Sequence, residues 1–171
     1  MERHLTRRTL GALALSAAAA GLARAKSIAP PGGKPILTVS GRIGAFNKAD
    51  TAEFDRDMLE ALGTHTVVTT TPWHNGPVRF EGVRMDRLMQ AVEATGDSVT
   101  AVALNDYATE IPMSDFRAHG TILALKRDGA YMPVRDKGPL FVIYPYDSDP
   151  DLKRQVYFNR SAWQVARLIV K

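Results

Sequence analysis

Tyr107-Ala108-Thr109-Glu110-Ile111-Pro112-Met113 is the most informative stretch of the chain. It follows an apolar run, Val99 to Leu104, which predicts a strand, and it begins in the turn Asn105-Asp106-Tyr107. Downstream, apolar runs alternate with Gly and Pro steps in the order Ile122-Leu123-Ala124-Leu125, Asp128-Gly129, Met132-Pro133 and Gly138-Pro139-Leu140-Phe141-Val142-Ile143-Tyr144-Pro145. This order predicts short strands joined by tight turns, including a hairpin that turns at Asp128-Gly129.

The rest of the chain adds further short strands and a few short helices. Strands are predicted at 36–43, 64–71, 78–81 and 163–170, and the β-branched run 64–71 is expected to be buried. Helices are predicted from the capping box Asp50-Thr51-Ala52-Glu53 to residue 62, at 85–94 and at 150–153. Many short strands with two or three short helices indicate an α+β domain built on a mixed β-sheet.

This order of segments resembles the molybdopterin-binding domain of the sulfite oxidase family. The resemblance runs from Thr64 to the C-terminus and includes Phe80-Glu81-Gly82-Val83, Leu88-Met89 and the closing Arg160-Ser161-Ala162-Trp163. It implies a sulfite oxidase-like molybdopterin-binding fold.

The residue that would bind the metal in that family is absent. The family strand that matches Val67 to Thr71 ends near a cysteine whose thiolate, a soft ligand, binds molybdenum. This chain has Thr69-Thr70-Thr71 there and contains no cysteine. A molybdenum cofactor is therefore less expected than a pterin alone, and no catalytic or metal-binding residue is assigned.

A second resemblance fits this loss. Thr-Thr-Pro-Trp (70–73), Leu-Asn-Asp-Tyr (104–107) and Tyr-Pro-Tyr-Asp (144–147) are similar to segments of small periplasmic proteins of this fold that lack the cysteine. Those proteins bind a reduced pterin and pass its presence to a membrane-bound cyclic-di-GMP enzyme. The resemblance implies a non-catalytic pterin sensor whose partner is the periplasmic domain of a membrane signalling protein. The alternatives are a molybdopterin-dependent oxidoreductase with an oxygen ligand such as Thr71 at the metal, and a structural partner without a ligand.

Eight residues are predicted to form the pterin site. Trp73 is the expected stacking face, because stacking on an aromatic ring adds ~0.5–1.5 kcal/mol to burial; a loop tryptophan pinned to the core is the competing interpretation. Asp106, with Glu110 as second choice, is expected to accept hydrogen bonds from the guanidine-like edge of the ring. Asn105 and Tyr107 are expected to make flanking polar contacts. Lys137, and Arg160 with Ser161, are expected to bind a phosphate or a side chain of the pterin. Trp163 is expected to lie in the core.

The first 25 residues have the features of a signal peptide. Arg7 and Arg8 precede an apolar run from Leu10 to Leu22, and Ala23-Arg24-Ala25 suits signal peptidase. The run is shorter than the ~20 apolar residues that span a bilayer, so a retained anchor is less favoured. We expect a signal peptide at 1–25, a flexible lead-in at 26–35 and a single domain at 36–171 that works in the periplasm without membrane insertion after cleavage. Thr6-Arg7-Arg8-Thr9-Leu10 resembles a twin-arginine motif, and ordinary Sec export is equally open.

The net charge and the motifs that the sequence lacks argue against several other classes of function. Removal of residues 1–25 leaves 18 basic and 17 acidic residues, a net charge of about +1, so nothing favours nucleic-acid binding. The acids Asp147, Asp149 and Asp151 resemble the start of a calcium loop, but Leu152 and Phe158 occupy the places of the required Gly and Glu. No nucleophile elbow or phosphate loop occurs in the sequence.

Overall fold

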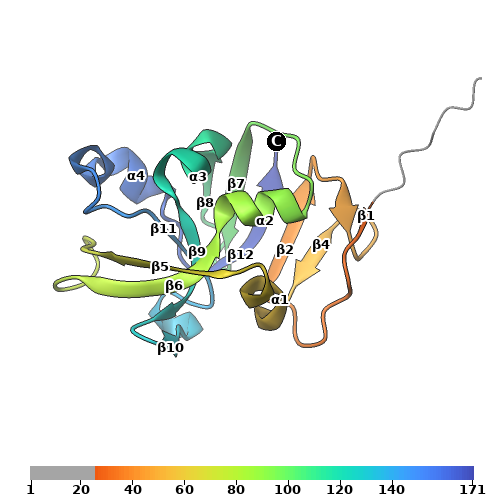
Figure 1. The fold of residues 1–171 in the computed structure, drawn as a ribbon, viewed down its shortest axis with the longest axis horizontal. Coiled ribbons are helices and arrows are strands. Elements are labelled where there is room, and N and C mark those ends of the chain that lie inside the picture. Colours follow the sequence, from red (N-terminus) through yellow and green to blue (C-terminus); the bar gives the residue numbers. More distant parts are fainter. Residues whose placement is uncertain (1–25) are drawn as a thin grey trace, which may run out of the picture.

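The computed structural model describes residues 26–171 as two five-stranded β-sheets, a short two-stranded pair and short helices (Figure 1). The predicted signal peptide lies outside the described residues. One sheet has the strand order β10-β9-β6-β5, with β11 also paired to β9, and all of its pairs are antiparallel. Its strands are β5 (Thr64–Thr69), β6 (Val78–Arg84), β9 (Ile122–Arg127), β10 (Ala130–Tyr131) and β11 (Phe141–Ile143).

The second sheet is mixed and has the order β4-β2-β12-β7-β8. Only β12 and β2 pair in parallel; the other three pairs are antiparallel. Its strands are β2 (Leu37–Gly41), β4 (Ala52–Phe54), β7 (Ser98–Ala103), β8 (Ala108–Pro112) and β12 (Val165–Val170), while β1 (Lys26–Ser27) and β3 (Ala45–Phe46) form a separate short pair. The predicted α+β class with mixed sheets is confirmed.

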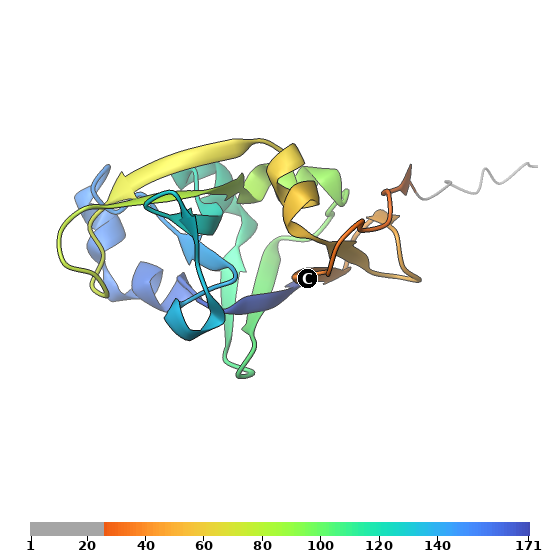
Figure 2. The same ribbon diagram turned by 90° about the horizontal axis from the view of Figure 1, so that it is seen from below.

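Short helices join and cover these strands. They are α1 (Arg56–Ala61), α2 (Met85–Ala91), α3 (Met113–His119) and α4 (Gln155–Arg160), with the 3₁₀ turns η1 (Val134–Asp136) and η2 (Pro150–Lys153). None of the helices within residues 26–171 combines the length and the apolar character that crossing a membrane requires. Figures 1 and 2 both place the β5–β6 loop at the same end of the molecule as η2 and α4.

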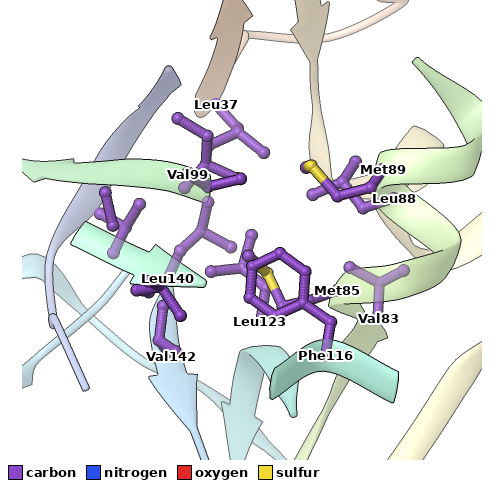
Figure 3. Packing of buried hydrophobic residues seen from close by; sticks show 14 of the residues in the cluster. Leu37, Val83, Met85, Leu88, Met89, Val99, Phe116, Leu123, Leu140 and Val142 are labelled. Atoms are coloured by element: carbon purple, nitrogen blue, oxygen red, sulfur yellow. The ribbon is translucent and has the colours of Figure 1, made fainter. Parts of the chain in front are cut away.

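The main hydrophobic core combines side chains from both sheets with side chains from α2 and α3. Figure 3 shows Leu37 and Val99 of the second sheet on the same cluster as Leu123 of the first sheet, Met85 of α2 and Phe116 of α3. These five side chains are at most 1% exposed. Truncating a buried aromatic such as Phe116 to alanine costs about 3–5 kcal/mol, so this cluster accounts for a large share of the stability.

Strand β9 separates the main core from a smaller one. Leu123 and Leu125 enter the main cluster, whereas Ile122 and Ala124 enter a cluster with Phe80, Phe141 and Ile143. Successive side chains of a strand point to opposite faces, so four consecutive buried residues require a packed layer on each side. Trp73 packs against both clusters, and this places the loop after β5 at their junction.

The structure corrects two expectations about individual elements. The capping box at 50–53 does not start a helix: Ala52–Phe54 is β4, and Asp55 caps α1 by accepting from Met58 N at 2.9 Å. Strand β5 is not buried throughout, because it pairs only with β6 and most of its residues face solvent. The sequence patterns also missed α3 and α4. The hairpin of β9 and β10 and the Asp149 cap of η2 are confirmed.

Candidate functional site

A cleft of about 410 Å³ opens between three segments that are far apart in the sequence. They are the loop after β5, the turn after β7, and α4 with the residues that follow it. Aromatic rings and uncharged polar groups line it: Pro72, Trp73, Ala103, Asn105, Tyr107, Gln155, Phe158, Asn159, Ser161, Ala162 and Trp163.

Trp73 is fixed by other aromatic rings. Its ring centroid lies 5.4 Å from that of Phe141, 5.6 Å from that of Trp163 and 6.0 Å from that of Phe158, in tilted or edge-on arrangements. Such geometries are the favoured ones for aromatic pairs. Trp73 packs on the core, as the competing interpretation expected, and it also lines the cleft, so its stacking role stays a prediction.

A chain of hydrogen bonds holds the loop that carries Trp73. Arg127 donates two bonds to Asp136, at 3.1 and 2.6 Å, and one to Nε2 of His74 at 3.1 Å. A guanidinium can only donate, so Nε2 accepts and the proton of neutral His74 is on Nδ1. Nδ1 lies 2.8 Å from Oγ1 of Thr71, which also accepts from Trp73 N at 3.3 Å. Burial and the charge of Arg127 lower the pKa of His74, which keeps this arrangement neutral.

The three threonines at the end of β5, Thr69, Thr70 and Thr71, all make hydrogen bonds. Asp147 accepts from Thr70 N and Thr70 Oγ1, both at 2.6 Å, and its own N donates to Thr69 Oγ1 at 3.0 Å. The bond from Lys153, followed by those from Thr70, holds the pKa of Asp147 well below its usual range. Within residues 26–171 no group of three His, Asp or Glu side chains is placed to hold a metal ion.

Four of the eight predicted site residues line the cleft: Trp73, Asn105, Tyr107 and Ser161. The hydroxyl of Tyr107 donates to Asn159 O at 3.1 Å and so links the β7–β8 turn to α4. Ser161 Oγ donates to Tyr157 O at 2.8 Å and is hydrogen-bonded to the buried Tyr146 hydroxyl. These contacts bring the turn and α4 together on one side of the cleft.

The structure does not place the other four predicted residues on the cleft lining. Asp106 has φ +62°, so its side chain leaves the turn towards solvent, is 86% exposed and pairs with Arg167 at 3.1 Å. Glu110 is exposed and contacts Lys171 at 3.3 Å. Arg160 points to Asp115, 2.8 Å away. Lys137 lies at the margin of the cleft, where its Nζ is 5.1 Å from the centroid of the Trp163 ring.

Sequence reasoning missed the contribution of α4 to the cleft. Gln155, Phe158 and Asn159 all line it, and they have the i, i+3, i+4 spacing that places side chains on one helix face. That spacing was the available signal. The core position predicted for Trp163 is wrong: it is 37% exposed and forms part of the lining.

Comparisons with known proteins agree on one family. The family model described as the oxidoreductase molybdopterin binding domain matches residues 51–147, which is more than half of the chain. Among solved structures, the sulfane dehydrogenase SoxCD from Paracoccus pantotrophus matches with a TM-score of 0.55 and 14% identity, which shows the fold alone. The match covers 78% of this chain and 37% of that one. No curated protein is significantly similar in sequence.

Proposed function

This chain belongs to the oxidoreductase molybdopterin binding domain family, and we propose that it binds a reduced pterin without a metal and acts as a non-catalytic ligand sensor. The family binds molybdopterin, which is itself a pterin. The observation that carries the proposal is an aromatic cleft beside three hydrogen-bonded threonines, in a segment that resembles the end of the family's metal-binding strand.

The cleft suits a flat heterocycle. Its volume of about 410 Å³ lies in the range of small-molecule sites, which is roughly 300–1,000 Å³. Trp73, Phe158 and Trp163 supply apolar ring surface, and the amides of Asn105 and Asn159 supply polar atoms beside it. A few directional polar groups in an apolar cleft are the usual means of orienting a bound ring.

The same residues do not fit a molybdenum ion. A hydroxyl oxygen has two lone pairs, and those of Thr71 Oγ1 accept from His74 Nδ1 and Trp73 N. Coordination by Thr71 Oγ1 would require breaking these bonds, with no thiolate in compensation. Oγ1 of Thr70 donates to Asp147 at 2.6 Å and is oriented by that carboxylate. This argues against the second candidate function, an oxidoreductase with an oxygen ligand at the metal, and we derive no step through a metal.

The proposed sensor works in the periplasm and reports to the periplasmic domain of a membrane signalling protein. The charged and apolar pattern of residues 1–25 supports export. Exposed apolar side chains near the cleft support contact with a protein, because such patches mark interaction sites. Leu104, Tyr107 and Trp163 are each more than a third exposed, and Leu104 N is bonded to Gln164 O beside Trp163.

Tryptophan fluorescence tests the proposal directly. The chain has two tryptophans and both line the cleft, so a bound ring should quench most of the intrinsic emission. Protein purified from the periplasm would be titrated with a reduced pterin under anaerobic conditions and analysed for metals by mass spectrometry. Trp73→Ala removes both the stacking face and its apolar burial and should weaken binding by about 10- to 100-fold. Tyr131→Ala, which removes an exposed ring elsewhere, should leave it unchanged.

Two outcomes would contradict the proposal. One is a folded parent protein that binds no reduced pterin. The other is about one molybdenum per chain together with sulfite or sulfoxide turnover, which would establish the oxidoreductase instead.

A further inference from the structure

The lining of the cleft carries no formal charge. None of its eleven residues is a Lys, Arg, His, Asp or Glu. Molybdopterin carries a phosphate, and phosphate sites in proteins are built from Arg, Lys or converging backbone N–H groups. A phosphate drawn into this cleft would lose hydration without gaining a cation, which is costly for a charged group.

Two cations near the cleft, Arg160 and Lys153, are paired with carboxylates. The guanidinium of Arg160, next to two lining residues, bonds to the largely buried carboxylate of Asp115. That carboxylate also accepts from the hydroxyl of Tyr144 at 2.7 Å, so releasing Arg160 would leave a buried acid with one partner. Lys153 is held by Asp147 at 2.7 Å. Lys137 lies over the Trp163 ring at the margin.

Three of the lining residues have side-chain amides: Asn105, Gln155 and Asn159. Gln155 Nε2 donates to Asn159 Oδ1 at 2.7 Å, so Gln155 Oε1 can accept from a ligand and Asn159 Nδ2 can donate to one. Asn105 Oδ1 accepts from Tyr107 N at 3.2 Å, and its Nδ2 can donate. A neutral pterin edge presents N–H donors beside a carbonyl acceptor, and uncharged amides match both.

We infer that the cleft selects an unphosphorylated, uncharged pterin and discriminates against phosphorylated forms such as molybdopterin. This inference rests on the proposed function and specifies its ligand class. It replaces the carboxylate that the sequence suggested, Asp106, with amides of the β7–β8 turn and α4. Binding should consequently be nearly independent of salt, because no ion pair forms.

A matched pair of ligands tests the inference. The probes are 6-hydroxymethyl-7,8-dihydropterin and its diphosphate, which share one ring and differ only in the charged group. The full exported chain should bind the unphosphorylated probe at least ~10-fold more tightly, with the same affinity at low and high salt. Lys137→Gln should change neither affinity.

A gain-of-charge variant gives a second readout. Gln155→Lys places a cation in the cleft and should improve binding of the diphosphate selectively, with the gain lost at high salt. Gln90→Lys adds the same charge on an exposed position of α2 and should have no effect.

Equal or tighter binding of the diphosphate by the parent would overturn the inference and leave pterin binding intact. Loss of diphosphate affinity in Lys137→Gln would also overturn it, since Lys137 would then be a phosphate ligand. If neither probe quenches the tryptophans, the inference falls together with the proposed function.

Discussion

Thr71→Val should destabilise the protein, although the two side chains have nearly the same shape. The substitution removes the oxygen that accepts from His74 Nδ1 and Trp73 N, so two donors lose their partner. An orphaned buried donor costs about 1–3 kcal/mol. His74 is only partly buried and the Trp73 N bond is long, so we expect a total near the low end, about 2 kcal/mol.

The same substitution elsewhere in the fold provides the control. Oγ1 of Thr100 on β7 is the one buried side-chain oxygen without a hydrogen-bond partner in the part of the chain that the structure describes. Thr100→Val removes an unsatisfied group and should leave stability unchanged or raise it. Thr71→Val and Thr100→Val are thus the same chemical change, but only Thr71→Val should lower the stability.

Thermal melts followed by circular dichroism would measure both variants. For a domain of this size about 2 kcal/mol corresponds to a fall in Tm of roughly 6 °C for Thr71→Val. Tryptophan emission of the folded variant should also shift, because Trp73 loses a backbone bond. A Thr71→Val protein as stable as the parent would refute the hydrogen-bond chain described here.

Three further predictions concern other parts of the chain. The pKa of His74 is lowered below 6.5, so the unfolded state binds the proton more readily than the folded state. The contribution of His74 to stability should therefore be complete above about pH 6.5 and be lost as the pH falls through the lowered pKa. Thermal melts at several pH values should show that His74→Gln flattens this dependence. Asp115→Ala should cost about 3–5 kcal/mol in denaturant unfolding, since it leaves a partly buried guanidinium without its carboxylate, while Asp106→Ala should cost under about 1 kcal/mol because its ion pair is exposed. Replacing Arg7 and Arg8 by Lys should stop export if the twin-arginine route is used, and unchanged periplasmic protein in cell fractions would assign the chain to Sec.

The order of the strands in the sequence was predictable because most of them carry a local signature. The Asp128-Gly129 turn fixes the β9–β10 hairpin, and Asp149 before Pro150 caps η2. The capping box at residue 50 failed because a capping motif is only a local preference. There, pairing of β4 with β2 buries Ala52 and Phe54 and outweighs the start of a helix.

The candidate site was only half predictable. Residues in turns at strand ends, such as Asn105 and Tyr107, were found because such turns tend to converge in this fold. The directions of side chains could not be read in the same way. Asp106 lies between two lining residues, yet its positive φ turns its carboxylate outward to Arg167. Arg160 is directed away by Asp115, a partner 45 residues distant that no local pattern reveals.

The loss of the cysteine and the bonding of the threonines are best understood together. A thiolate at position 71 would be a soft metal ligand, but sulfur accepts hydrogen bonds weakly. In this chain the same position has to accept from His74 and from the backbone of Trp73, and it thereby positions the aromatic wall of the cleft. The surrounding residues, Arg127 with Asp136 on one side and Asp147 on the other, fix threonines in their present orientation. The hydrogen bonds of the threonines therefore hold the aromatic wall of the cleft in place, and this supports the proposal that the cleft binds an organic ring without a metal.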